Sequence, residues 1–167
     1  MVSIPDGVTV SVSGRKIVAK GPKGTVEREF AVKGLTLSVS GKKVLVEKAD
    51  GVKMGAGVLN AIKAGIRNMC EGAKDGYSRN MQVVYAHFPI SLEIKGNSLK
   101  IKNFIGEKQN REARIIGATK VEVKGQNITV SGPDKEAVGQ TIANIKTATR
   151  IRNRDPRIFQ DGLYNVE

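Results

Sequence analysis

The 167-residue chain contains one cysteine, one histidine and no tryptophan. Cys70 alone cannot form an intrachain disulfide, which favours a reducing compartment, and we expect a cytoplasmic protein. Cys70 and His87 cannot supply the four ligands of a structural metal site, so we expect no such site. The chain also lacks a long uncharged apolar run and a signal-peptide pattern at its start, which argues against a membrane protein.

Acidic residues are few compared with basic ones. Lys and Arg total 28 against 16 Asp and Glu, giving a formal net charge of +12 and a pI near 10.0. Such a balance favours a polyanionic partner, which is RNA, DNA or an anionic membrane surface. The hydrophobic fraction of 40% is enough for packed cores, so we expect a folded protein.

Aromatic residues make up only 4% of the chain. The segment Lys102-Asn103-Phe104-Ile105-Gly106 does not match the basic-Gly-aromatic signature of an RNA-recognition motif. An array that stacks splayed single-stranded bases is therefore a poor hypothesis. The abundant Lys and Arg residues suit contacts to the phosphates and sugars of folded RNA better.

No motif indicates catalysis. The loop Gly21-Pro22-Lys23-Gly24 lacks the length and the Lys-Ser/Thr ending of a Walker loop. Gly55-Ala56-Gly57 is followed by Asn60 where a dinucleotide fingerprint requires its third glycine. No Ser or Cys accompanies His and a carboxylate in a recognisable setting, and we expect that the protein is not an enzyme.

Two halves of the chain resemble each other. Pro5 and Pro89, Gly41 and Gly125, and Asp50 and Asp134 are each separated by 84 positions. This spacing predicts a tandem duplication with an α+β fold, in which each copy is a mostly antiparallel β-sheet packed with one α-helix. The predicted domains are residues 1–78, the first repeat, and residues 79–167, the second repeat with a basic C-terminal tail.

Alternation of apolar and polar residues predicts the strands of both copies. In the first copy they are Val8–Val12, Lys16–Lys20, Thr25–Phe30, Leu35–Ser40 and Val44–Lys48. In the second they are Met81–Ala86, Ile90–Ile94, Leu99–Phe104, Arg111–Ile115, Lys120–Lys124 and Asn127–Ser131. Helical periodicity predicts helices at Val52–Glu71, started by Asp50 and Gly51, and at Asp134–Thr149, with Lys74–Asn80 as the junction.

Three glycines weaken the first predicted helix, and they have two explanations. Gly55, Gly57 and Gly65 indicate a backbone packed closely on the sheet or on RNA, or a frayed first turn. We favour close packing. The apolar face of this helix is predicted to contain Val58, Ile62, Ile66 and Met69.

The stretch Gln140–Tyr164 begins as the second helix and then becomes strongly basic. Its cationic residues are Lys146, Arg150, Arg152, Arg154 and Arg157. Pro156 prevents a regular helix from continuing through the segment. Arginine presents a planar fork of donors that suits phosphate oxygens, so we predict that these residues bind a nucleic-acid backbone. An unpaired stretch of this kind is ordered by a partner or stays mobile, and it has no equivalent in the first copy.

A second basic set lies on the predicted strands and loops of the second copy. It consists of Lys100, Lys102, Lys108, Arg111 and Arg114. Lys100 and Lys102 are two apart on a strand and therefore share one face. Binding of RNA and a solvated strand face are about equally good explanations of this set.

The chain resembles the archaeal and eukaryotic type of large-subunit ribosomal protein six. The resemblance rests on IPDGV and GPKGTVEREF, on the GIRNMCEG-to-GY junction, on MQVVYAHFPISLEIKGNSLKIKNFIGEK, and on the ending GPDKEAVGQTIANIKTATRIRNRDPRIFQDGLY. It covers essentially the whole chain, and FQDG behind an Arg-rich segment is a specific signal. The lack of a long charged terminal extension resembles the archaeal type more closely.

The resemblance implies a two-copy fold and no enzymatic activity or cofactor. It also implies a structural role in the large ribosomal subunit and in translation. The implied partners are large-subunit rRNA near the base of the factor-binding stalk and the sarcin–ricin loop, and neighbouring large-subunit ribosomal proteins, with one copy per ribosome expected. The alternative hypothesis is a general basic module for DNA or an anionic surface.

Overall fold

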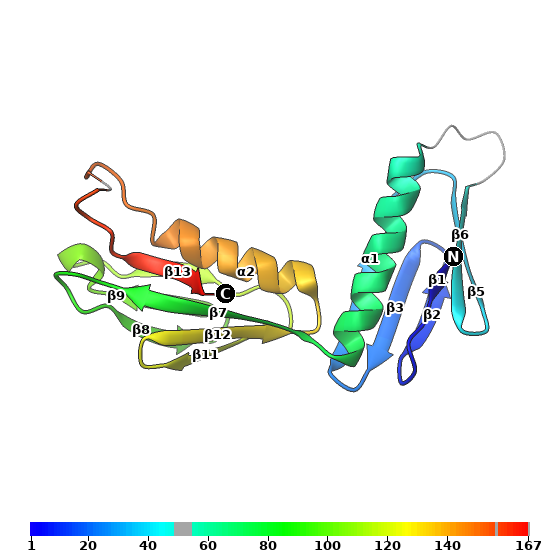
Figure 1. Ribbon diagram of the computed structural model, residues 1–167, viewed down its shortest axis with the longest axis horizontal. Helices are drawn as coiled ribbons and strands as arrows, with labels where there is room; N and C mark the ends of the chain where they lie inside the picture. Colours follow the sequence, from blue (N-terminus) through cyan, green and yellow to red (C-terminus); the bar gives the residue numbers. More distant parts are fainter. Residues whose placement is uncertain (49–54, 156, 167) are drawn as a thin grey trace. The chain divides into compact units, whose positions relative to one another are not determined.

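The computed structural model describes residues 1–48, 55–155 and 157–166 (Figure 1). The chain divides into two compact units. The first comprises Met1–Gly76 and the short segment Pro133–Lys135, and the second comprises Tyr77–Gly132 and Glu136–Glu167.

Two antiparallel three-stranded sheets and one helix form the first unit. One sheet has the order β2-β3-β4, with β2 at Thr9–Ser13, β3 at Lys16–Gly21 and β4 at Gly24–Glu29. The other has the order β1-β6-β5, with β1 at Val2–Ser3, β6 at Lys43–Lys48 and β5 at Leu35–Ser40. Alternate strand residues such as Ile17, Ala19 and Val44 are fully buried, as the period of a half-buried strand requires.

Helix α1 (Ala56–Lys74) covers the apolar side of this unit (Figure 1). Its buried face includes Ile62, Ile66 and Met69, as the helical spacing predicts. Val58, predicted on the same face, is 43% exposed, so that prediction is wrong. The described helix begins at Ala56 and ends at Lys74, three residues beyond the predicted end at Glu71. The predicted start at residues 50–52 lies outside the described residues.

Among the described residues, the second unit has one more strand than the first and a short 3₁₀ helix, η1 (Phe104–Gly106), which takes the last residue of the predicted strand Leu99–Phe104. Its smaller sheet has the order β10-β9-β8, with β10 at Arg111–Arg114, β9 at Ser98–Lys102 and β8 at Ser91–Lys95. Its larger sheet has the order β11-β12-β7-β13, with β11 at Lys120–Lys124, β12 at Asn127–Gly132, β7 at Tyr77–Val84 and β13 at Gly162–Val166. Helix α2 (Lys135–Ala148) buries Val138, Ile142 and Ile145 against this core.

The two units repeat one topology, which confirms an α+β tandem duplication. The hairpins β5-β6 and β11-β12 both turn at a glycine with positive φ, Gly41 and Gly125, a backbone region that glycine enters without steric cost. The hairpins β2-β3 and β8-β9 turn at Gly14 and Gly96, whose separation is 96 − 14 = 82. The offset of 84 therefore does not hold along the whole repeat.

Three features of the fold differ from the predictions. Strand β7 begins at Tyr77, so the last four of the seven residues in the predicted junction Lys74–Asn80 are paired with β12. Strands β1 and β13 were not expected from the sequence. In the first unit β1 pairs with β6, while in the second β7 pairs with β12 and also with β13 on its other side. Strand β13 therefore has no counterpart among the described strands of the first unit.

The glycines of α1 differ in what surrounds them. No described atom would lie within 4 Å of a Cβ at Gly55 or Gly57, so close packing on the sheet is wrong for both. A Cβ at Gly65 would meet the Phe30 ring at 3.4 Å, an ordinary van der Waals contact.

Gly21, at the end of β3, packs against the end of α1. A Cβ at this position would lie 2.3 Å from the Ala73 carbonyl oxygen, which accepts a hydrogen bond from the Lys23 amide at 3.0 Å.

These surroundings predict opposite effects for two alanine substitutions. Gly57→Ala should raise the free energy of unfolding by less than about 1 kcal/mol, because alanine loses less backbone entropy than glycine and this position lies in the first turn of α1. Gly21→Ala should lower it, because the backbone of β3 must move away from the end of α1. Urea denaturation of both variants checks the pair, and a destabilised Gly57→Ala variant would show that this position packs against something else.

Candidate nucleic-acid interface

The basic segment of the second unit leaves its core at the end of α2 and returns to it at β13. We call the residues from Arg150 to Gln160 the tail loop; Pro156, the predicted helix breaker, lies outside the described residues. The predicted tail is paired beyond this loop, because Gly162–Val166 bonds to β7 and Leu163 is buried. The end of the predicted tail is therefore part of the sheet, and the Arg-rich part before it forms the loop.

The loop is also held by its apolar side chains. Ile151 and Phe159 pack against a small core that contains Phe104 and Ile105. The His87 ring lies 6.2 Å from the Phe159 ring between centroids. Ile158, by contrast, is 65% exposed. The tail loop thus has a fixed base and an exposed outer part.

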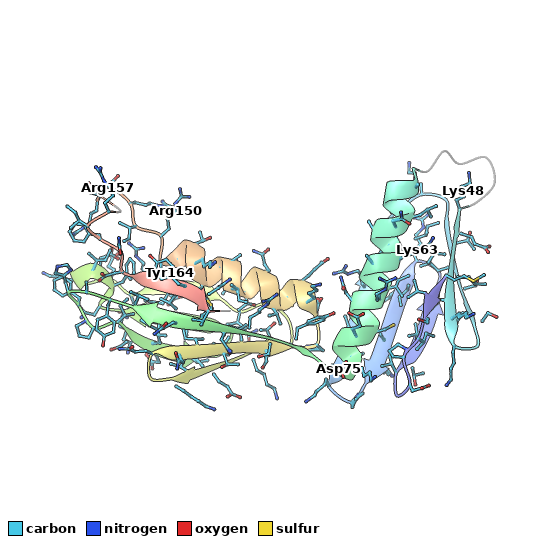
Figure 2. All side chains as sticks on the ribbon, viewed as in Figure 1. Lys48, Lys63, Asp75, Arg150, Arg157 and Tyr164 are labelled. Carbon is cyan, nitrogen blue, oxygen red and sulfur yellow. The ribbon has the colours of Figure 1, made fainter. Side chains whose placement is uncertain are left out.

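The tail arginines fall into two kinds. Arg150 and Arg152 are exposed, and neither side chain makes an ion pair with a described residue. Arg154 lies over the Phe159 ring at 4.8 Å from its centroid. Figure 2 shows Arg150 and Arg157 on the loop. Lys146 lies in the last turn of α2. Arginines free of carboxylate partners are the better phosphate donors, because nothing must be displaced.

Arg157 is paired within the loop. Its Nε and Nη2 donate to the two carboxylate oxygens of Asp155 at 3.2 and 3.1 Å. Hydrogen bonds from Arg157 hold the pKa of the Asp155 carboxyl below its usual range. The Asp155 carbonyl accepts from the amides of Ile158 and Phe159, which closes a turn. An exposed pair of this kind is weak, so Arg157 can still exchange its carboxylate for a phosphate.

Arg111 joins three parts of the second unit. Its Nε and Nη2 donate to both carboxylate oxygens of Glu107 at 2.8 and 2.6 Å. Its Nη1 donates to the carbonyl oxygens of Ala148, at 2.9 Å, and Arg150, at 3.0 Å. Its guanidinium also lies 4.3 Å from the centroid of the buried Phe104 ring. The structure therefore places Arg111 as a support for the base of the tail loop rather than as an open phosphate donor.

Titration of Glu107 should affect this support. The hydrogen bond from Arg111 lowers the pKa of Glu107, with a smaller contribution from the charge of Arg154. A carboxyl whose pKa is lower in the folded protein than in the unfolded chain stabilises the folded protein when it is ionised. This stabilisation is fully present above the unfolded-state pKa, and it is lost as the pH falls through the folded-state pKa. Glu107→Gln should therefore destabilise the protein at pH 7 and have progressively less effect below about pH 4. Urea denaturation across this range tests it, and a pH-independent difference would contradict it.

The remaining basic residues lie either in the loop that precedes β10 or on the outer face of the smaller sheet. Lys108 is exposed and follows Glu107, which Arg111 connects to the base of the tail loop. Lys100 and Lys102 share the face opposite the buried Leu99 and Ile101, as predicted. Lys100 pairs with Glu112 at 3.2 Å and Lys102 with Glu93 at 2.7 Å.

Arg114 is exposed on β10, on the same outer face as Glu112. The carboxylates on this face compensate part of its positive charge, but exposed ion pairs are weak, so Lys100 and Lys102 can still exchange their carboxylates for phosphates. The candidate interface is therefore centred on the tail loop, with Lys146 and Lys108 beside it.

In the described parts of the chain no helix is long and apolar enough to cross a membrane.

Comparison with known proteins shows extensive similarity. The family model described as ribosomal protein L6 matches residues 4–76 and 88–162. The large ribosomal subunit protein uL6 of Methanosarcina mazei is 45% identical over 166 residues, covering 99% of this chain and 94% of the relative. The proteins of the same name from Methanocella arvoryzae and Aeropyrum pernix are 44% and 41% identical, over 98% and 99% of this chain and 93% and 92% of the relatives.

Proposed function

The chain belongs to the ribosomal protein L6 family of the large ribosomal subunit, and from this premise we propose that its second unit binds large-subunit rRNA. The resemblance in the sequence is thereby confirmed, including its archaeal type. The relatives are structural ribosomal proteins, which confirms that the chain is not an enzyme.

The tail loop supports this proposal most strongly. Arg150 and Arg152 are exposed and have no ion pair with a described residue, on a loop tied to the fold at both ends. A loop held at its base loses less conformational entropy on binding than a free tail does. We place Lys146, Arg154, Arg157 and Lys108 in the same interface. Lys100, Lys102, Arg111 and Arg114 complete the proposed rRNA-binding set, with Arg111 acting through the loop that it supports.

The location within the ribosome is also a proposal. We place the protein near the base of the factor-binding stalk and the sarcin–ricin loop, next to other large-subunit proteins and in one copy per ribosome. This location requires a cytoplasmic protein. We further propose that the two predicted domains, residues 1–78 and 79–167, correspond to the two compact units, whose boundary lies two residues earlier, at Gly76. We also propose that the added strand β13 and the tail loop specialise the second domain for RNA.

A competition assay tests the proposed function. The full chain should bind a large-subunit rRNA fragment containing the sarcin–ricin loop more tightly than a random DNA duplex of equal length and charge, measured at one fixed salt concentration. Equal affinity for the two would favour a general basic module and contradict specific rRNA binding.

A further inference from the structure

A cavity of about 590 Å³ lies in the second unit between the last turn of α2 and β13. Its lining includes Lys146, Arg150, Ile151, Phe159, Asp161 and Tyr164. The volume falls within the range of roughly 300–1,000 Å³ that is typical of small-ligand pockets. The cavity therefore has room for a group much larger than a phosphate.

Tyr164 gives this cavity an aromatic wall whose orientation is fixed. Its hydroxyl donates to the Gln160 carbonyl oxygen at 3.0 Å. A Cβ at Gly162 would lie 3.1 Å from Cε2 of Tyr164, so the ring rests against the backbone of a residue without a side chain. Tyr164 is nevertheless 47% exposed. Figure 2 labels it at the second unit. An aromatic ring whose position is restricted by a hydrogen bond and which is partly exposed is a suitable surface for stacking a single base.

Asp161 gives the same cavity a hydrogen-bond acceptor. The residue is only 2% exposed, and its Oδ1 accepts from the Ala86 amide at 3.1 Å. No described residue donates to Oδ2. Oδ2 is not among the fully buried side-chain atoms that lack a partner, so it keeps some access to solvent, and a ligand that brings N–H groups into the cavity can donate to it. Guanine presents two adjacent donors, N1–H and the exocyclic amino group, on its Watson–Crick edge, whereas adenine and cytosine present one amino group beside an acceptor.

We propose that this cavity binds one unstacked guanosine of an RNA, with the base against Tyr164, its donor edge at Asp161 and its phosphate near Lys146 and Arg150. This inference rests on the proposed function, because it identifies a nucleotide within the RNA that the tail loop binds. It adds one base contact to a surface otherwise suited to phosphates. The scarcity of aromatic residues argues against an array of stacked bases, and a single site is compatible with it.

Titration of the full chain with mononucleotides tests the pocket without rRNA. Guanosine 5′-monophosphate should give saturable NMR shifts at the amides of residues 161–164, and adenosine 5′-monophosphate should bind about tenfold more weakly. Asp161→Asn keeps an acceptor for the Ala86 amide, and it should remove the preference for guanine. Equal binding of the two nucleotides would overturn the guanine assignment. Shifts limited to Lys146 and Arg150, and reproduced by inorganic phosphate, would overturn the base pocket.

Binding of the rRNA fragment gives a second test. Tyr164→Leu should weaken it roughly 5- to 150-fold, the range expected for one lost stacking contact. Tyr85→Leu is the matched control, because Tyr85 is 38% exposed and lies outside the cavity lining. Thermal denaturation verifies that both variants are folded. Equal affinity of the two variants would overturn the proposal, whereas failure of the wild-type protein to prefer rRNA over DNA would overturn the proposed function instead.

Discussion

Replacing Arg150, Arg152 and Arg154 together by glutamine should weaken rRNA binding and reduce its salt dependence by about two to three units of the log–log slope. Each phosphate contact releases condensed counterions, so each lost contact removes roughly one unit. Arg150 and Arg152 are exposed, and no described carboxylate competes with a phosphate for either. Arg154 is held over Phe159 and can keep that contact while its outer edge meets RNA.

The measurement is a series of binding isotherms from low to moderate salt with one rRNA fragment. A variant with Arg15, Lys42 and Lys43 replaced by glutamine removes the same charge from exposed positions of the first unit. The control should change the slope less than the tail variant does. An unchanged slope in the tail variant would remove these three arginines from the interface.

Arg111→Gln should have the second large effect, by loosening the tail loop. The substitution removes the paired hydrogen bonds to Glu107, those to the Ala148 and Arg150 carbonyls, and the contact over Phe104. The side chain of Arg111 is only 24% exposed, so these interactions are partly shielded from water. We expect the free energy of unfolding to fall by about 2–3 kcal/mol. Trypsin should then cleave at Arg150 and Arg152 faster than in the wild type.

Arg114→Gln is the matched control for this prediction. Arg114 lies on the same strand with its side chain on the exposed face, so its loss should leave stability within about 0.5 kcal/mol of the wild type. Arg111→Lys should rescue poorly, because an ammonium cannot reproduce the planar fork that bonds to Glu107 and two carbonyls. If Arg111→Gln were as stable and as protease-resistant as Arg114→Gln, Arg111 would not support the loop.

Local patterns in the sequence were enough to predict most of the strands. Alternation located Lys120–Lys124 with the observed bounds, and the glycines at the hairpin turns indicated where strands reverse. Strand β13 escaped because Gly162–Val166 has no alternation and begins with a glycine. It forms through pairing with β7, which lies some eighty residues earlier in the chain, and such pairing leaves no local signal.

Contacts between residues far apart in the sequence also decide which residues of the candidate interface are available. The tail arginines form a visible cluster in the sequence, but whether each has a partner depends on the fold. Arg111 is two residues from the buried Ala113, a spacing that could have indicated the inner face of β10. Its carbonyl partners, however, lie 37 and 39 residues away at the end of α2. Asp161 likewise acquires its partner Ala86 only through tertiary structure.

The central claim is that the tail loop lies against rRNA in the large subunit. Ile158 is 65% exposed on this loop, so Ile158→Cys in a Cys70→Ala background can carry a tethered hydroxyl-radical source while every arginine remains. Val39→Cys, at a position 40% exposed on β5, is the control. In reconstituted large subunits we expect strong, localised cleavage of rRNA from position 158, and stronger cleavage there than from position 39. The absence of rRNA cleavage from position 158 would contradict it.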